Sequence, residues 1–370
     1  MTIRSFLVLF SLALSILLGF LLAHGGPAQG AESRPRGRTR PRIGLSLDTL
    51  KEARWQGDRD AFVKRTGELG ADVLVQAANG DDAKQIVDVK ALITSDIDAL
   101  VIVAHDGRAM AEAVRLAHAS GIPVLAYDRI IRDADLDLYL STNNVRIGVL
   151  QAQYVVDTLP HTAARPLRLV RIHGARTDNN ASLIKQGQDQ VLAPLLARGE
   201  VKVLFEDWAD DWKPESAKQI VNAAITQNGA TLDAVLAAND GTAGGALQAL
   251  EDEGLIAGQA SARTKVVVTG QDADLVALQR IARGSQAMTI YKPLKQLASR
   301  GAELAVQLAR RVPIIARVGV DNGFKEVPAE LLEMVVVTRD NLRETVIRDG
   351  FHSAAEVFGT SQPAREAASQ

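Results

Sequence analysis

The chain has 370 residues, too many for one average domain and enough for two compact domains of ordinary size. Its formal net charge of −2 gives no indication of a polyanionic substrate, and we expect no nucleic-acid partner. Cysteine is absent, which excludes disulfides, thiolate metal sites and a cysteine nucleophile, and suits a protein exported into an oxidising compartment.

The first residues have the pattern of a signal peptide. Arg4 supplies a positive charge, residues 6–22 form an uninterrupted run of apolar or small side chains, and Ala28 and Gly30 follow in an A-x-G pattern. We therefore predict a cleaved signal peptide over residues 1–30 and a periplasmic protein. An uncleaved membrane anchor is the alternative, because about 17 apolar residues is the short limit for a membrane-spanning helix.

Arginines alternate with Pro, Gly and Thr in the next segment. Mutual repulsion and proline stiffness favour an extended chain, so we predict a solvated, unpacked linker over residues 31–42. The arginines are Arg34, Arg36, Arg38, Arg40 and Arg42.

From Ile43 onwards, short apolar runs alternate with longer segments of helical spacing. Nearly continuous apolar runs are typical of parallel strands that helices bury on both faces. Most intervening segments have about 12–20 residues, enough for a crossover helix. The runs are IGLSL at 43, DVLVQA at 72, DALVIVA at 98, PVLAYD at 123, LYLST at 138, LRLVRI at 167, VKVLFE at 201, DAVLAAN at 233, KVVVTG at 265 and MTIYK at 288.

This alternation predicts an α/β protein with two doubly wound parallel-sheet lobes. We place the first lobe at residues 43–142 plus 293–320, the second at 143–291 plus 321–350, and a C-terminal tail at 351–370. A helix is expected from Pro293 to about Arg310, and the run MVVVT at 334 has no obvious helical partner. A chain that crosses between the lobes more than once would explain both features and form a hinge.

Polar side chains closely follow many of the apolar runs. In open parallel sheets, ligands bind outside the carboxyl ends of the strands, where the order of connection reverses. The first helix is expected to begin near Arg54 and Trp55, close to the same edge. The polar groups are Asp128-Arg129, Asp178-Asn179-Asn180, Asn239-Asp240, Gln271-Asp272 and Lys292.

These residue types fit a neutral sugar, whose hydroxyls donate and accept hydrogen bonds and whose ring has flat C–H faces. Arg129 can donate to neighbouring hydroxyls, and the carboxylates of Asp128 and Asp272 can accept from them. The amides of Asn180 and Asn239 can both donate and accept, and the ammonium group of Lys292 is a compact donor. The rings of Trp55 and Trp212 can stack on the sugar.

Each residue also has a purely structural interpretation. Asn239 or Asp240 could cap the helix that follows, and Gln271-Asp272 could do the same. Further alternatives are an exposed ion pair for Asp128 and Arg129, a solvated turn for Lys292, and packing on a lobe surface for Trp208.

Other chemistries lack their motifs. No G-x-G-x-x-G follows the first strand, and neither a phosphate-binding P-loop motif nor a G-x-S-x-G motif is present. The six histidines are scattered without paired spacing. We therefore expect no cofactor, no metal and no enzymatic activity, although sequence alone cannot supply the separation of a glycosidase carboxylate pair.

Several stretches carry a resemblance to a known family. They are RWQGDRD at 54, VQAANG at 75, VLAYDR at 124, DNNA at 178, ANDGTAGGALQAL at 238, TGQDADL at 269, TIYKPL at 289 and VIRDGFH at 346. From about Ile43 to His352 the chain resembles the D-xylose-binding proteins of bacterial ABC transporters, within the ribose- and galactose-binding class. The loop reading AHDG, with His105, departs from the Pro and Tyr usual there. Extra residues occur near 161–166 and 258–264.

The resemblance implies the type I periplasmic binding fold, two lobes joined by three crossover strands that close over the sugar. It implies a monomer that delivers D-xylose or a related monosaccharide to an inner-membrane ABC permease. Alternatives are a sugar sensor for a membrane receptor, or a repressor, which would need an N-terminal helix-turn-helix. The implied contacts are Arg54, Asp128, Arg129, Asp178, Asn180, Asn239, Asp272 and Lys292, with Trp55 and Trp212 bracketing the ring.

Overall fold

The computed structural model describes residues 39–256 and 266–359. The predicted signal peptide, arginines 34, 36 and 38 of the predicted linker, and the extra residues near 258–264 lie outside these ranges. Within the described ranges, no helix is both long and apolar enough to cross a membrane.

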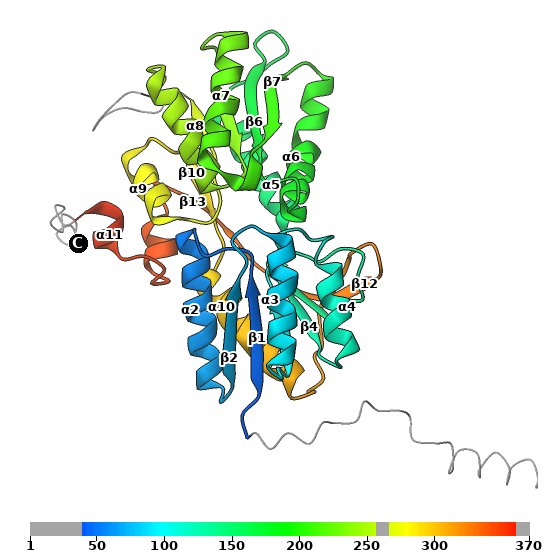
Figure 1. The fold of residues 1–370 in the computed structure, drawn as a ribbon. Coiled ribbons are helices and arrows are strands. Elements are labelled where there is room, and N and C mark those ends of the chain that lie inside the picture. Colours follow the sequence, from blue (N-terminus) through cyan, green and yellow to red (C-terminus); the bar gives the residue numbers. More distant parts are fainter. Residues whose placement is uncertain (1–38, 257–265, 360–370) are drawn as a thin grey trace, which may run out of the picture. The chain divides into compact units, whose positions relative to one another are not determined.

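The first lobe, which carries the labels β1, β2, β4 and β12 in Figure 1, is built on a seven-stranded sheet with the order β11-β12-β5-β4-β3-β1-β2. All neighbours are parallel except β11 and β12, which pair antiparallel at one edge. The strands are β1 (Arg42–Leu47), β2 (Asp72–Ala77), β3 (Ala99–Ile102), β4 (Val124–Tyr127), β5 (Leu138–Thr142), β11 (Val318–Asp321) and β12 (Glu326–Leu332).

Helices bury both faces of this sheet, as the continuous apolar runs predict. Alternate side chains of each strand point to opposite faces, so Val101 and Ile102 of β3 belong to different hydrophobic clusters. One cluster contains residues of α2 (Ala53–Glu68) and α10 (Leu294–Ala309), the other residues of α3 (Asp82–Thr94) and α4 (Ala111–Ala119).

The second lobe has a four-stranded parallel sheet in the order β7-β6-β8-β9. Its strands are β6 (Leu167–His173), β7 (Val201–Trp208), β8 (Ala234–Ala237) and β9 (Val267–Val268). Its helices are α5 (Asn144–Thr158), α6 (Asn179–Ala197), α7 (Pro214–Asn228), α8 (Asp240–Asp252) and α9 (Leu275–Arg283). The α5 and α6 helices share one hydrophobic cluster with the sheet, and α7 and α8 share the other.

The chain passes between the lobes three times, after β5, after β10 (Met288–Tyr291) and after β12. The isolated run at 334 forms β13 (Val335–Thr338), which pairs antiparallel with β10. The expectation of more than one crossing is thus confirmed. A short π-helical turn, η2 (Arg343–Ile347), follows β13.

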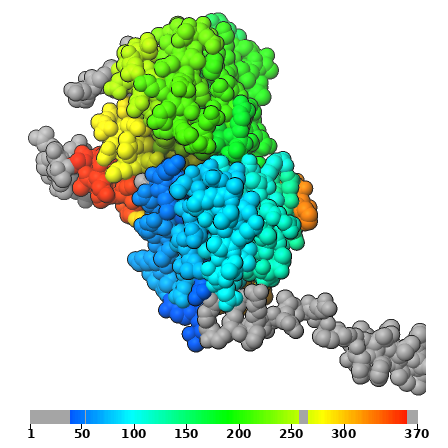
Figure 2. All heavy atoms as spheres, in the orientation of Figure 1, coloured from blue at the N-terminus to red at the C-terminus, as the bar shows by residue number. Residues whose placement is uncertain are grey.

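Three sequence-based boundaries are corrected. Residues 321–332 belong with the first sheet rather than the second lobe, because β12 pairs with β5. The predicted C-terminal tail begins too early, because α11 (Ala354–Phe358) packs against α9 (Figures 1 and 2) and Val357 is buried. The linker ends earlier than residue 42, because Arg40 pairs with Asp72 at 3.2 Å and Arg42 begins β1.

Candidate functional site

A cavity of about 270 Å³ lies at the carboxyl ends of the strands of both lobes. The strand order reverses between β1 and β3 in the first sheet and between β6 and β8 in the second, and the segments after these strands help to line the cavity. All the predicted contact residues line it, namely Arg54, Trp55, Asp128, Arg129, Asp178, Asn180, Trp212, Asn239, Asp272 and Lys292.

Two cations hold together carboxylates from the two lobes. In the first turn of α2, Arg54 contacts Asp128 Oδ2 through Nη2, and its Nη1 lies 3.3 Å from Asp272 Oδ1, 218 positions later in the chain. Lys292, on the crossing after β10, places Nζ 3.4 Å from Asp272 Oδ1 and 3.9 Å from Asp128 Oδ2. The Lys292 side chain is only 2% exposed, so the solvated-turn interpretation is wrong.

Both of these carboxylates sit on unusual backbone. Asp128 has φ of 62° and Asp272 has φ of 99°, in the left-handed region that aspartate tolerates better than most residues. Asp272 does not cap a helix, because α9 begins later, after Asp274. The cap interpretation of Gln271-Asp272 is therefore wrong.

The cations keep Asp128 charged. Burial alone would raise the pKa of Asp128, but Arg54, Lys292 and Arg129 lower it to about 2. By contrast, burial raises the pKa of Asp58, one helical turn after Arg54, to about 7 despite the nearby guanidinium. At neutral pH, Asp128 is therefore an ionised hydrogen-bond acceptor in a desolvated site.

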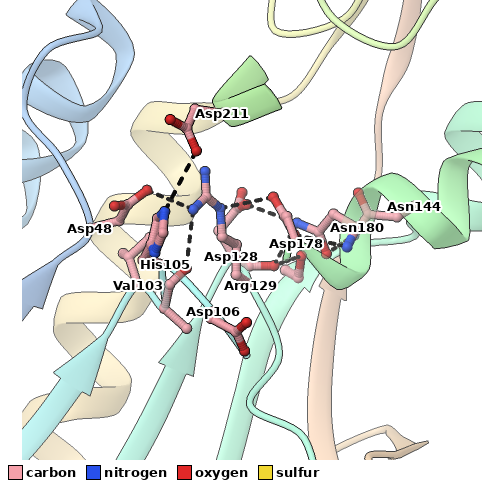
Figure 3. A network of polar contacts seen from close by, with 12 residues as sticks. Asp48, Val103, His105, Asp106, Asp128, Arg129, Asn144, Asp178, Asn180 and Asp211 are labelled. Carbon is pink, nitrogen blue, oxygen red and sulfur yellow. Dashed lines mark hydrogen bonds and ion pairs between the residues drawn. The ribbon is translucent and has the colours of Figure 1, made fainter. Parts of the chain in front are cut away.

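A third cation is likewise placed between two carboxylates (Figure 3). Arg129 donates from Nη1 to Asp48 Oδ2 at 2.8 Å and to the Ala104 carbonyl at 3.1 Å, and its Nε lies 2.9 Å from Asp178 Oδ2. Asp48 belongs to the first lobe and Asp178 to the second. Arg129 is 8% exposed, and Asp128 is not its ion-pair partner, so the interpretation of these two residues as an exposed pair is wrong.

Amide side chains connect the helix N-termini to the cavity. Asp178 caps α6 by accepting from the Asn180 backbone, and Asn180 donates from Nδ2 to Asp128 Oδ1 at 3.1 Å across the lobes. Asn239 caps α8 through a reciprocal pair of bonds with Thr242. The cap interpretation is thus confirmed for Asn239, although its Nδ2 donates to no acceptor among the described residues and remains available to a ligand.

Asp240, the other candidate cap, is instead buried behind the cavity wall. It accepts from Gln286 Nε2 at 2.8 Å, from the Thr289 hydroxyl at 2.9 Å and from the Asp274 backbone at 3.0 Å. Burial, with Asp274 and Asp272 nearby, raises its pKa well above the usual value. Asp240 therefore supports the wall rather than capping α8.

The two predicted stacking rings differ in their surroundings. Trp55 is 4% exposed, with the guanidinium carbons of Arg54 and Arg129 at 4.2 and 5.4 Å from its ring centroid. Trp212 has a positive φ of 60° and lies so close to Gly174 that a Cβ there would be 2.2 Å from Trp212 Cη2. Trp208 packs on His173, with ring centroids 4.9 Å apart, and is not one of the cavity-lining residues, which confirms its lobe-surface interpretation.

Several other residues line the cavity that were not among the predicted contacts. Asp48 directly follows β1 and His105 lies shortly after β3, at the point where the strand order reverses. The strand-end rule, that ligands bind outside the carboxyl ends of parallel strands, therefore predicts both. Asp211 lies in the 3₁₀ turn η1 (Asp210–Trp212), which carries no such signal. Gln271 belonged to the strand-end groups and also lines the cavity.

Residues suited to a metal ion do not gather here. Within the described residues, no group of three or more His, Cys, Asp or Glu side chains is arranged to hold a metal ion. The four carboxylates Asp48, Asp128, Asp178 and Asp272 each have a cationic neighbour in Arg54, Arg129 or Lys292. Each of these four buried carboxylates is therefore already paired with a cation of the protein.

Comparison with known proteins identifies relatives over most of the chain. Residues 43–311 match the family model of the periplasmic binding protein domain. The D-xylose-binding periplasmic protein of Haemophilus influenzae is 46% identical over 317 residues, covering 86% of this chain and 92% of that protein. The D-xylose-binding periplasmic protein of Escherichia coli is 41% identical, covering 95% of this chain and 98% of that protein.

Solved structures agree with these relatives. A carbohydrate transporter solute binding protein from Chloroflexus aurantiacus, in complex with D-glucose, is 32% identical with a TM-score of 0.78, covering 86% of this chain and 98% of that one. The predicted α/β fold with two parallel-sheet lobes is confirmed. The prediction of a binding protein rather than an enzyme is confirmed by the family match and the curated relatives.

Proposed function

This chain belongs to the family of periplasmic binding protein domains, and we propose that it is the substrate-binding component of an ABC transporter that captures D-xylose between its lobes. The relatives support the identity of the sugar, since two D-xylose-binding proteins are 46% and 41% identical to this chain. The cavity supports the class of ligand on independent physical grounds.

The observation that carries the proposal is a polar cavity whose buried cations are each already paired with carboxylates. Arg54, Lys292 and Arg129 each lie between two carboxylates, so an anionic ligand would meet four carboxylates and only three cations in this group. A neutral ligand with many hydroxyls avoids that repulsion. The cavity volume of about 270 Å³ is below the ~300–1,000 Å³ of typical drug-sized sites and suits a monosaccharide.

Unpartnered polar atoms add to this argument. Buried polar atoms nearly always have a hydrogen-bond partner, and exceptions call for an explanation. Among the described residues, four that line the cavity have a buried side-chain atom without one: Asp48 Oδ1, Arg54 Nε, Trp212 Nε1 and Gln271 Oε1. These two acceptors and two donors match hydroxyl groups, which can play either role.

Binding would work through lobe closure. The contacts of Arg54 with Asp272, Arg129 with Asp178 and Asn180 with Asp128 join the two lobes around the cavity. A sugar that contacts both sides stabilises the closed arrangement by its greater affinity for it. A sugar that lacks the matching hydroxyl leaves a buried donor or acceptor of the cavity without a hydrogen-bond partner, at a cost of about 1–3 kcal/mol for each group.

The cellular setting belongs to the same proposal. The D-xylose-binding relatives are periplasmic proteins, so we place this chain in the periplasm, exported by a cleaved segment over residues 1–30. The closed form would present a monomer to an inner-membrane permease. A sensing role is the second candidate, because a 30% identical relative from Rhizobium radiobacter is a multiple sugar-binding periplasmic receptor.

Calorimetric titration with a panel of sugars tests the proposal. We expect the purified protein to bind D-xylose with one site per chain and more tightly than D-ribose, L-arabinose or D-glucose. Tighter binding of D-glucose would contradict the choice of xylose, and absence of heat with every aldose would contradict the sugar-binding function itself.

A site variant tests where the sugar binds. Asp272→Asn preserves the shape of the side chain but removes a charged acceptor, so we expect the Kd for D-xylose to rise about 10- to 150-fold. Asp157→Asn, at an exposed carboxylate on α5, is the matched control and should leave the Kd unchanged. Unchanged affinity in both variants would contradict the assignment of the site.

A further inference from the structure

His105 contacts charged groups of both lobes. It lies beyond β3 and lines the cavity, with a side chain that is 16% exposed. Its Nδ1 lies 2.9 Å from Asp82 Oδ1 in the first turn of α3. Its Nε2 lies 3.8 Å from Asp211 Oδ1 in η1 of the second lobe, as Figure 3 shows. One imidazole ring therefore joins a carboxylate of its own lobe to a carboxylate across the cavity.

The charge state of the ring decides whether both contacts are attractive. Imidazole has two nitrogens, and the neutral ring carries a proton on only one of them. A proton on Nδ1 is fixed by Asp82, which leaves the lone pair of neutral Nε2 directed toward the Asp211 carboxylate. The protonated ring donates from both nitrogens and carries the positive charge that Asp211 attracts.

We propose that protonated His105 forms an interlobe latch with Asp211, so that the affinity for sugar rises as the pH falls through the range in which His105 titrates. This inference rests on the proposed binding of D-xylose between the lobes and adds a regulation of that same site. The His105–Asp211 contact exists only when the two lobes approach each other. Stabilising it therefore favours the closed, sugar-bound form over the open form.

Carboxylates of its own lobe favour protonation of His105. Burial alone would lower the pKa of His105, but the hydrogen bond to Asp82 and the charges of Asp48 and Asp82 raise it above the usual value. The hydrogen bond from Lys213 lowers the pKa of Asp211, which remains ionised when His105 titrates. The charged groups that act on the ring are Asp48, Asp82, Arg129 and Asp211, with Lys213 acting through its pair with Asp211.

The direction of the linkage follows from the two states. In the open form His105 lacks the Asp211 carboxylate, which attracts the protonated ring, but opening also relieves the burial that lowers its pKa. The latch requires the attraction to outweigh this burial, so that the pKa of His105 is lower in the open form than in the closed form. Sugar binding then takes up protons in the pH range between the two pKa values. The gain in affinity is complete below the open-state pKa and is lost as the pH rises through the closed-state pKa.

The experiment is a calorimetric titration of D-xylose into wild type and variants between pH 5.5 and 8.5. Asp211 is 53% exposed, so the pair is partly screened, and we expect wild type to bind about two- to fivefold more tightly at the acidic end than His105→Gln does. At pH 8.5 the two proteins should differ less. Repeating the titrations in buffers of different ionisation enthalpy should detect proton uptake in wild type and not in His105→Gln.

Asp211→Asn removes the latch without touching His105, and asparagine tolerates the φ of 50° at this position. It should lose the same pH-dependent gain. His118→Gln is the control for His105, because His118 has a similar bond to Asp137, 2.7 Å away in its own lobe. Asp210→Asn is the control for Asp211, from the same turn. Both controls should keep the wild-type pH dependence.

The outcomes separate this inference from the proposed function. If D-xylose binds but His105→Gln and Asp211→Asn follow the wild-type pH profile, the latch is wrong and the binding function stands. If no protein binds D-xylose at any pH, the proposed function fails first. An NMR titration of the His105 ring provides the second measurement, since the latch requires its pKa to rise on sugar binding in wild type and not in Asp211→Asn.

Discussion

Replacing Arg129 with methionine should weaken sugar binding by several orders of magnitude. Arg129 joins the lobes through Nε, 2.9 Å from Asp178 Oδ2, and holds Asp48 from the other side. A charged hydrogen bond contributes about 1.5–3 kcal/mol, so losing the interlobe bond and one sugar contact amounts to about 3–6 kcal/mol. At about 1.4 kcal/mol for each factor of ten, the Kd should rise roughly 10²- to 10⁴-fold.

Arg132→Met is the matched control for this variant. Arg132 also reaches the N-terminus of α6, donating to the Asn179 side chain at 3.0 Å, but its partner is neutral and the residue is not one of those that line the cavity. Both residues are partly exposed, so water screens this single charge-assisted bond; its loss should cost at most about 1.5 kcal/mol and raise the Kd by no more than about tenfold.

Calorimetry with D-xylose gives the Kd of each variant, and thermal unfolding shows whether each remains folded. If Arg129→Met does not fold, Arg129→Lys retains the charge with a single donor group and should show an intermediate loss. A folded Arg129→Met protein with a Kd within about threefold of wild type would refute the bridging role of Arg129.

Three further predictions concern affinity, pH dependence and packing. Gly174→Ala should displace Trp212, because the new Cβ would lie 2.2 Å from its ring, and unchanged D-xylose affinity and tryptophan fluorescence would contradict this. The pKa of Asp58, about 7 in the fold, lies above the unfolded value of ~3.9, so its stabilising contribution is full below about pH 4 and is lost as the pH rises through 7. Asp58→Asn should remove that loss. Between pH 4 and pH 8, urea unfolding should show the free energy of unfolding of Asp58→Asn rising relative to that of wild type by up to about 4 kcal/mol. A difference between the two proteins that does not change with pH would be inconsistent with the raised pKa of Asp58. Gly148→Ala should lower the melting temperature, because its Cβ would lie 1.9 Å from a carbonyl oxygen of α6. Gly57→Ala, which has open space at its Cβ, should raise the melting temperature slightly. Equal shifts of the melting temperature in the two variants would exclude close packing as the cause.

The regular core of the fold could be predicted from the sequence. Parallel strands buried on both faces leave continuous apolar runs, and the run at 98 is an example, since all four residues of β3 are buried. The edge strand β11 escaped this reasoning because its residues are mostly exposed, so no such run marks it. Without β11 and β12, the last crossing was placed too early in the chain.

The sequence could predict which residues line the candidate site, but not which of their side chains pair with each other. The strand-end rule gathered Asp128, Asp272 and Lys292, because it needs only the position of a residue after a strand. Which cation meets which carboxylate depends on how two lobes approach each other, and Arg54 meets a partner 218 positions away. Such a pairing has no local pattern in the sequence.

Local backbone geometry also lay outside the reach of the sequence. The η1 turn places Asp211 and Trp212 at positive φ, which aspartate tolerates without requiring it and which is unusual for tryptophan. That turn brings Asp211 within 3.8 Å of His105 across the cavity. The residues that could regulate binding were therefore harder to find than those that could contact the sugar.

A crystal structure of the protein with D-xylose tests most directly whether this cavity is the sugar site. We predict one sugar between the lobes, hydrogen-bonded to Asp272, Arg129 and the amide nitrogen of Asn239, with Trp212 against its ring. A sugar bound at another place, or a complex in which these side chains do not contact it, would contradict the proposed site.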